Sequence, residues 1–141
     1  MRMRNVALTF IAYVVLTFGC AFVWHLVLFR GFYDRIGYFG SEEPVIALGL
    51  LAILIQAFVI ALVYPLFERG DHPLAEAARV SATFGVTIVS VQVLAAAAKH
   101  HAPASLEWFL FEGLYFLVQF ALLALAFALI HRTPGNRRQA V

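Results

Sequence analysis

The sequence has few charged residues, and this shortage decides what kind of protein it can be. Only 13% of its 141 residues are charged, 63% are hydrophobic, and the mean hydropathy is +0.88. A soluble domain is usually about 25% charged and about 45–50% apolar. The composition therefore excludes an ordinary water-soluble domain and indicates a protein that lies in lipid.

The residues and motifs of common catalytic sites are also missing. A single cysteine, Cys20, excludes an internal disulfide bond, and its place in an apolar run predicts ordinary helix packing. The sequence has no glycine-rich phosphate loop, no Cys-x-x-Cys pair and no Gly-x-Ser-x-Gly turn. Basic residues do not gather as they do on nucleic-acid-binding domains. We therefore expect neither a conventional enzyme nor a nucleic-acid partner.

Long uncharged runs dominate the chain instead. Four stretches contain no Asp, Glu, Lys or Arg, and they cover residues 6–29, 45–67, 80–98 and 113–130. Each has about the 17–25 residues that a helix needs to cross a bilayer. Backbone groups in lipid must be satisfied within the segment, and these runs lack the alternation of barrel strands. The sequence predicts an all-α membrane protein, one four-helix bundle over residues 1–141, with helices at about 6–29, 45–67, 76–98 and 106–131.

The arginine and lysine residues predict the orientation of this bundle. Seven lie in the segments that share a side with both termini, and three lie in the segments on the other side: Arg2, Arg4, Arg69, Arg79, Arg132, Arg137 and Arg138 against Arg30, Arg35 and Lys99. Because cytoplasmic segments carry the excess of positive charge, we expect both termini in the cytoplasm. There we expect a plain turn over residues 68–73 and a basic tail that begins near His131.

The third predicted helix differs from the others in its small and hydroxylated residues. Ser81 and Gly85 are spaced four apart, as in the small-xxx-small pairs that let membrane helices approach closely. We expect these two residues to mediate helix packing and the third helix to lie at the centre of the bundle. A path lined by its hydroxyl groups is the alternative interpretation.

Polar side chains inside the predicted helices mark where a function could lie, because ionisable groups in a membrane are costly. Glu112, Tyr115 and Gln119 have helical offsets of 0, 3 and 7 and therefore share one face, which we expect inside the bundle. Counted by helical rise, other polar residues reach similar depths. The candidate polar site contains Glu112, Tyr115, Gln119, Gln92, Gln56 and His25.

Glu112 is the sharpest candidate of this set, and two interpretations of it stay open. It is either a structural residue, paired with Lys99 or protonated and hydrogen-bonded to Tyr or Gln, or a proton or cation site. In the second interpretation the site opens to the outside, with His25 or His100 as a neighbour.

A metal or haem site is a weaker possibility at the same end of the bundle. Imidazole and carboxylate groups are common metal ligands, and the candidates are His25, His100, His101 and Glu107. Adjacent His100 and His101 point to different sides if helical, and no helix carries two histidines four residues apart. We therefore expect no bound cofactor, although the sequence leaves the point open.

Several segments together resemble a known group of proteins. They are the stretch from Phe32-Tyr33 to Glu43-Pro44, the helix end Tyr64-Pro65, the helix start Pro73-Leu74-Ala75-Glu76 and the pattern Glu112-Gly113-x-Tyr115-x-x-x-Gln119. The chain resembles a broad group of uncharacterised bacterial four-helix inner-membrane proteins. The resemblance implies the same fold and a bacterial plasma membrane, and it brings no activity or catalytic residues.

Three functions remain in order of preference. The first is a structural or accessory membrane subunit, or a homo-oligomeric membrane protein, with no enzymatic activity. The second is a small transporter or channel for a proton-coupled or cationic solute that uses Glu112. The third is a membrane metal or haem protein that uses His25 and His100. Four helices of this size enclose little space, so we expect a solute path to need an oligomer.

Overall fold

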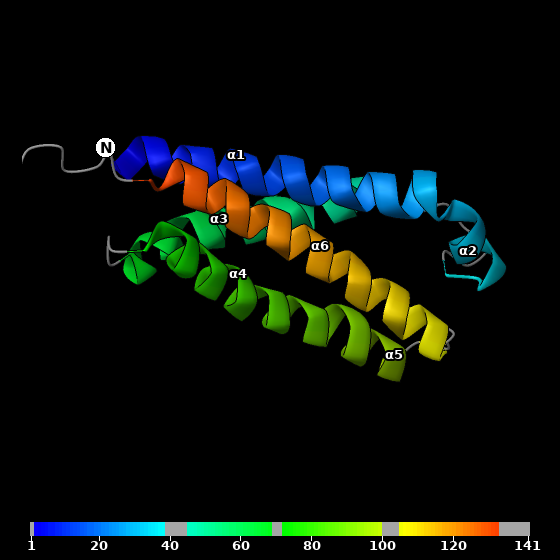
Figure 1. Cartoon of the computed structure of the whole chain (residues 1–141). Helices are drawn as coiled ribbons and strands as arrows, with labels where there is room; N and C mark the ends of the chain where they lie inside the picture. Colours follow the sequence, from blue (N-terminus) through cyan, green and yellow to red (C-terminus); the bar gives the residue numbers. More distant parts are fainter. Residues whose placement is uncertain (1, 39–44, 69–71, 100–104, 133–141) are drawn as a thin grey trace, which may run out of the picture.

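The computed structural model describes residues 2–38, 45–68, 72–99 and 105–132, without the side chains of Arg2, Ala96 and Lys99. All regular structure in these ranges is helical (Figure 1). The elements are α1 (Arg2–Ala21), the π-helical η1 (Phe22–Leu28), α2 (Arg30–Arg35), α3 (Ile46–Phe67), α4 (Pro73–Val89), the π-helical η2 (Ser90–Ala95), α5 (Ala96–Lys99) and α6 (Leu106–Ile130).

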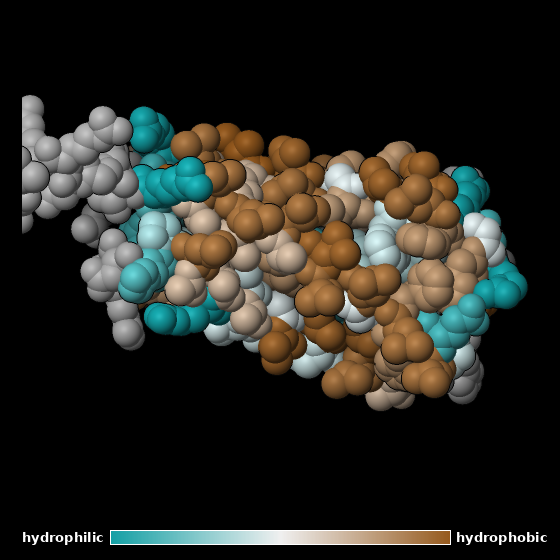
Figure 2. Space-filling model, in the orientation of Figure 1, coloured by the Kyte–Doolittle hydropathy of each residue, from teal (hydrophilic) through white to brown (hydrophobic). Residues whose placement is uncertain are grey.

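Four of these helical stretches are long and apolar enough to cross a membrane, as the uncharged runs predict. They are Met3–Leu28, Ile46–Phe67, Pro73–Ala95 and Leu106–Ile130. Large apolar side chains on them face outward, and Val86 and Leu117 are 71% and 68% exposed. The visible face shows a broad apolar belt between hydrophilic ends (Figure 2). An all-helical, membrane-spanning fold accounts for this surface, because lipid would cover the belt.

Local signals explain where the helices begin and end. Pro73 occupies the first turn of α4, where its missing N–H costs nothing. The Ser105 side chain accepts a hydrogen bond from the backbone N–H of Trp108 at 3.1 Å and so caps α6. Pro65 lies inside α3, which ends two residues later at Phe67. α1 and α4 begin at Arg2 and Pro73, a few residues before the predicted helix starts at about residues 6 and 76.

The helix at the centre of the bundle is α6, and our expectation that the third helix lies there is wrong. α6 contacts both α4 and α1, and α1 also contacts α3, whereas α4 contacts chiefly α6. In the apolar stretch of α6 that can cross the membrane, 44% is buried inside the bundle, compared with 28% for the stretch in Pro73–Ala95. Figure 1 shows α6 crossing between α1 and α4. The aromatic residues of α6, such as Phe116 and Phe127, form much of the core, which explains its central place.

Ser81 and Gly85 lie where α4 meets α6. Both are buried, and the position of a β-carbon on Gly85 would be 3.1 Å from the ring of Phe120. The absence of a side chain at residue 85 therefore lets the Phe120 ring lie directly against the α4 backbone.

Gly85→Leu is expected to lower the thermal stability of the detergent-solubilised protein. A leucine side chain has no room beside Phe120, so α4 and α6 must separate, at a cost of about 1–3 kcal/mol. Gly113→Leu is the matched control, because a β-carbon there meets no atom within 4 Å. Equal melting temperatures for the two variants would show that the contact at Gly85 does not hold the helices together.

Candidate functional site

A polar cavity of about 200 Å³ lies inside the bundle, near the end that carries α2. Its lining comes from all four membrane-spanning segments. All six residues of the candidate polar site are among those that line it: Glu112, Tyr115, Gln119, Gln92, Gln56 and His25. A space of this size and polarity holds several water molecules or one small solute.

Glu112 is the centre of the hydrogen bonds at this cavity. Its side chain, on α6, is almost fully buried, with the residue only 3% exposed. One carboxylate oxygen, Oε1, accepts a hydrogen bond from the Tyr33 hydroxyl at 2.7 Å and lies 3.2 Å from Nε2 of His25. A buried carboxylate needs such partners, because an unpaired charge in an apolar interior is very costly. The Lys99 partner that the sequence suggested has no described side chain.

His25 and Glu112 share one proton. Nδ1 of His25 lies 3.0 Å from the carbonyl oxygen of Ala21, which only accepts hydrogen bonds, so Nδ1 carries a proton. A hydrogen bond between Nε2 and Glu112 needs a second proton, held either by the imidazole or by the carboxyl group. The pair is therefore neutral with this second proton and carries one negative charge without it.

Aromatic rings fix the orientation of His25. The ring centroids of Tyr33 and Tyr115 lie 4.6 Å from the imidazole centroid, and that of Tyr38 lies 6.1 Å from it. These residues come from α2, α6 and the turn after α2. The segment after the first membrane helix thus folds back over the site, which the sequence analysis did not foresee.

Tyr33 is a permanent hydrogen-bond donor to Glu112. Its hydroxyl accepts a hydrogen bond from Nε1 of Trp24 at 3.2 Å, which directs its own proton to the carboxylate. Burial raises the pKa of the Tyr33 phenol above its ordinary value of 10.0, and the hydrogen bond to Glu112 raises it further. The phenol therefore stays protonated at neutral pH and stabilises the carboxylate.

Tyr33→Phe is expected to lower the free energy of unfolding at neutral pH by about 1–3 kcal/mol, because Glu112 loses a buried donor. A phenol whose pKa is raised by folding stabilises the folded state fully below its unfolded pKa, and the stabilisation is lost as the pH rises above it. The melting-temperature difference between wild type and variant should therefore shrink above pH 10.0. A difference that stays constant from neutral to strongly alkaline pH contradicts this assignment.

A row of buried polar residues runs along α1 and reaches the site at Thr17, and the sequence analysis missed it. Thr9, Tyr13 and Thr17 are spaced four apart, and all three are buried. The Tyr13 hydroxyl donates to Oε1 of Gln56 at 2.8 Å, and Nε2 of Gln119 lies 3.5 Å from the Thr17 hydroxyl. The i, i+4 spacing was the available signal, but hydroxyl groups inside an uncharged run did not single it out.

Gln119 has one buried acceptor without a hydrogen bond among the described residues. Its residue is 1% exposed, and its Oε1 has no hydrogen-bond partner among the described residues. Buried acceptors are nearly always satisfied by protein, water or ligand. Oε1 of Gln119 has almost no accessible surface, so the acceptor that α6 offers to the cavity is Glu112, on the same face of the helix.

Two π-helical segments flank the cavity. His25 belongs to η1, and Gln92, which is exposed, belongs to η2. A π-helical turn shifts the register of the side chains that follow it and is frequent at functional sites. In η1 the wider turn places the His25 ring against the Ala21 carbonyl. Neither π-helix follows from the hydrophobic pattern.

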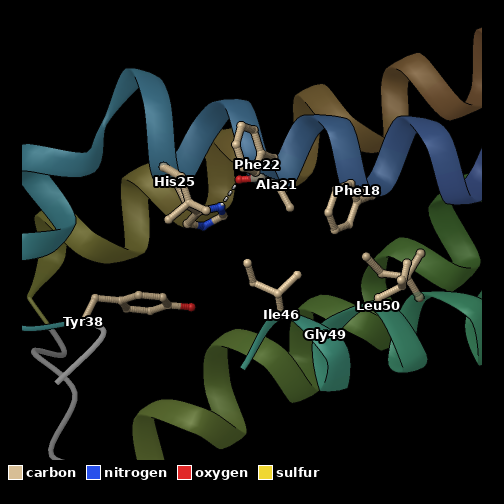
Figure 3. A pocket seen from close by; sticks show the side chains of 10 residues that line it. Phe18, Ala21, Phe22, His25, Tyr38, Ile46, Gly49 and Leu50 are labelled. Carbon is tan, nitrogen blue, oxygen red and sulfur yellow. Dashed lines mark hydrogen bonds between the residues drawn. The ribbon is translucent and has the colours of Figure 1, made fainter. Parts of the chain in front are cut away.

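An apolar groove of about 320 Å³ adjoins the cavity between the end of α1, η1 and the start of α3 (Figure 3). His25 and Tyr38 lie at one end of it, and Phe18 and Leu50 at the other. The groove and the cavity share part of their lining: Ala21, His25, Tyr38, Gly49 and Ile53. The groove therefore connects the polar cavity with the lipid-facing side of the bundle.

A second polar cluster lies at the opposite end of the bundle. His131 is buried, with Nε2 2.8 Å from the Thr9 hydroxyl and Nδ1 2.5 Å from Oε1 of Glu68. Its ring stacks on Tyr64, with the centroids 4.0 Å apart. Our predictions of a plain turn at Glu68 and of a tail from His131 are therefore wrong at these two residues. The cluster joins α1, α3 and α6, and only the folded bundle brings its members together.

His131→Gln is expected to destabilise the protein by about 1–3 kcal/mol, since a glutamine cannot satisfy both Thr9 and Glu68. His72→Gln is the matched control at the same end, because His72 is exposed. Thermal melting of both variants in detergent measures the difference. If His72→Gln costs as much as His131→Gln, the cluster does not tie the helices together.

The two candidate metal ligands that the structure describes, His25 and Glu107, have separate partners. Glu107 is at the surface, where it pairs with Arg35 at 3.0 Å, and His25 is occupied by Ala21 and Glu112. His100 and His101 lie outside the described residues. In the part of the chain that the structure describes, no three His, Cys, Asp or Glu side chains form a group that could hold a metal ion.

The fold and the site together define a four-helix, membrane-spanning protein with a buried carboxylate at a polar cavity. No family model, curated protein or solved structure matches the chain. The resemblance to bacterial four-helix inner-membrane proteins therefore depends on the motifs quoted above, and the function has to be argued from the site.

Proposed function

We propose that the protein is a small transporter in which Glu112 binds either a proton or a small cation with hydrogen-bond donors. This is the second of the three functions considered from the sequence. The observation that carries it is the contact of 3.2 Å between Oε1 of the buried Glu112 and Nε2 of His25, two residues that both line the polar cavity.

The exchange follows from the charge of the pair. Without the shared proton the pair carries one negative charge in a buried site, where a bare charge is costly. Either a proton or a cation in the cavity neutralises it. The pair has only one negative charge, so one proton or one cation is enough to neutralise it. Binding of the cation therefore displaces the proton, and the two compete for Glu112.

The hydrogen-bonding groups favour a cation that carries N–H groups. Glu112 is a hydrogen-bond acceptor in the lining of the cavity. A protonated amine or amidine-type group could donate to it, whereas a quaternary ammonium ion could not. The class of solute that we propose is therefore a small cation with hydrogen-bond donors.

The orientation and location are parts of the same proposal. The excess of arginine on the side of the termini supports a cytoplasmic His131 end and an external His25 end. The resemblance stated above supports a bacterial plasma membrane. In this arrangement the cavity lies near the outside, and the Glu68–His131–Thr9 cluster lies at the cytoplasmic end.

Lipid vesicles loaded with a pH-sensitive dye test the proposal. Guanidinium is the probe, because it is permanently charged and carries N–H donors. Added outside, it should exchange for internal protons and raise the internal pH, whereas tetramethylammonium, with the same charge and no N–H group, should not. Equal responses to the two cations, or none to guanidinium, would overturn the proposal.

A structural or accessory subunit, alone or as a homo-oligomer, is the competing function. It predicts no exchange with guanidinium and a fixed partner that co-purifies in mild detergent. A native mass spectrum gives the oligomeric state and any partner in the same experiment.

A further inference from the structure

The apolar groove beside the cavity is the feature that the proposed exchange does not use. Its non-polar lining lies between η1 and α3, inside the segments that cross the membrane. A small hydrophilic cation has no need of such a groove. Sites for amphiphilic ligands, by contrast, are mostly apolar, with a few polar groups at defined places and volumes of about 300–1,000 Å³.

The groove exists because two small residues lie on its opposing walls. Ala21 is on α1, and Gly49 is on α3, where a β-carbon would meet no atom within 4 Å. Figure 3 shows the space between these helices, with Phe22 and Ile46 beside it and His25 at one end. The groove is thus an open space between the two helices, and one of its ends lies at His25.

We infer that the protein binds amphiphilic cations, with the cationic head at Glu112 in the cavity and a single alkyl chain in the groove. The inference depends on the proposed function and specifies its substrate class. Continuity of the two spaces supports it, since Ala21, Gly49 and Ile53 line both. The charge of Glu112 supports the cationic head, and the apolar lining of the groove supports the chain.

Entry from the lipid phase follows from this geometry. At the other end of the bundle, His131 joins the helices through its contacts with Thr9 and Glu68. The groove faces the lipid side of the membrane-spanning segments, so an amphiphile already dissolved in the bilayer reaches the cavity laterally. Its cationic head leaves the membrane interface and binds Glu112, while its chain stays in apolar surroundings.

A chain-length series tests the inference in lipid nanodiscs. Guanidinium, butylguanidinium and hexylguanidinium are compared by the concentration at which each releases a proton from the protein. Leu50→Trp fills the end of the groove farthest from His25, and Leu50 does not line the cavity. Leu28→Trp is the matched control, because Leu28 lines a separate apolar groove with Gly19 and Val23.

In wild type, the concentration needed should fall by up to about fourfold for each methylene group that leaves water. Membrane partitioning contributes equally to every variant, so the comparison between variants is decisive. Leu50→Trp should weaken the response to hexylguanidinium by about tenfold or more, because the indole ring occupies the space that the chain needs while its head lies at Glu112. It should leave the response to guanidinium unchanged, and Leu28→Trp should alter neither.

If Leu50→Trp and wild type respond alike to hexylguanidinium, the groove holds a bilayer acyl chain only, and the inference is wrong while the exchange at Glu112 stands. If guanidinium itself releases no proton from wild type, the proposed function fails. The two failures are thus separate.

Discussion

Glu112→Gln abolishes the exchange of guanidinium for protons in vesicles, to the level of protein-free vesicles, if the proposal is correct. Glutamine has nearly the shape of glutamate but cannot exchange a proton or balance a cation. The Tyr33 hydroxyl can still donate to Oε1 of the amide, so the local fold is preserved. Internal pH after addition of guanidinium measures the effect.

Glu107→Gln is the matched control for this variant. Glu107 lies on the same helix, but its side chain is 55% exposed and pairs with Arg35 at the surface. Exposed ion pairs contribute only about 0–1 kcal/mol, so this variant should exchange like wild type. Loss of exchange in both variants, or in neither, contradicts the role of Glu112.

Gly49→Phe is expected to lower the rate of exchange by about tenfold or more, a rise of about 1.4 kcal/mol in the barrier, because the phenylalanine ring fills space that the solute needs. Gly49 lines both the cavity and the groove. The fold should tolerate the change, because a β-carbon at this residue meets no atom within 4 Å. The melting temperature should therefore stay close to that of wild type while exchange falls.

Gly19→Phe controls for the bulk of the new ring. Gly19 is on α1, a β-carbon there is equally free of contacts, and it lines neither the cavity nor its groove. This variant should exchange at the wild-type rate. A similar loss at residues 19 and 49 would indicate a general effect of the added ring and not a blocked path.

The sequence predicted the membrane-spanning helices because their signal is local. A run of uncharged residues long enough to cross a bilayer is visible without knowledge of the neighbours. The same holds for α6, where helical spacing places Glu112, Tyr115 and Gln119 on one face, and all three are buried. Whether these residues form a functional site stays a prediction.

Contacts between distant segments were not predictable in the same way. The pairing of Tyr33 with Glu112 requires the chain after α1 to fold back over the end of the bundle. The contact of His131 with Thr9 joins the two ends of the sequence. Single residues in a loop or a tail give no sign of such partners, because burial is decided by the packing of whole helices.

The central position of α6 illustrates a third limit. Small residues on the helix at 76–98 correctly marked a close contact at Gly85. They did not reveal that the partner helix, rich in aromatic residues, would contact two neighbours. Small residues indicate that a helix is closely approached, whereas the centre of a bundle depends on how many helices do so.

The most direct test of the account is proton release from the purified protein in weakly buffered detergent solution. Addition of guanidinium should release about one proton per wild-type chain, because a cation at the buried pair replaces the proton that it shares. Glu112→Gln should release none, and Glu107→Gln should behave like wild type. Release that is absent from wild type, or unchanged in Glu112→Gln, would contradict the claim that Glu112 binds a proton and a cation in competition.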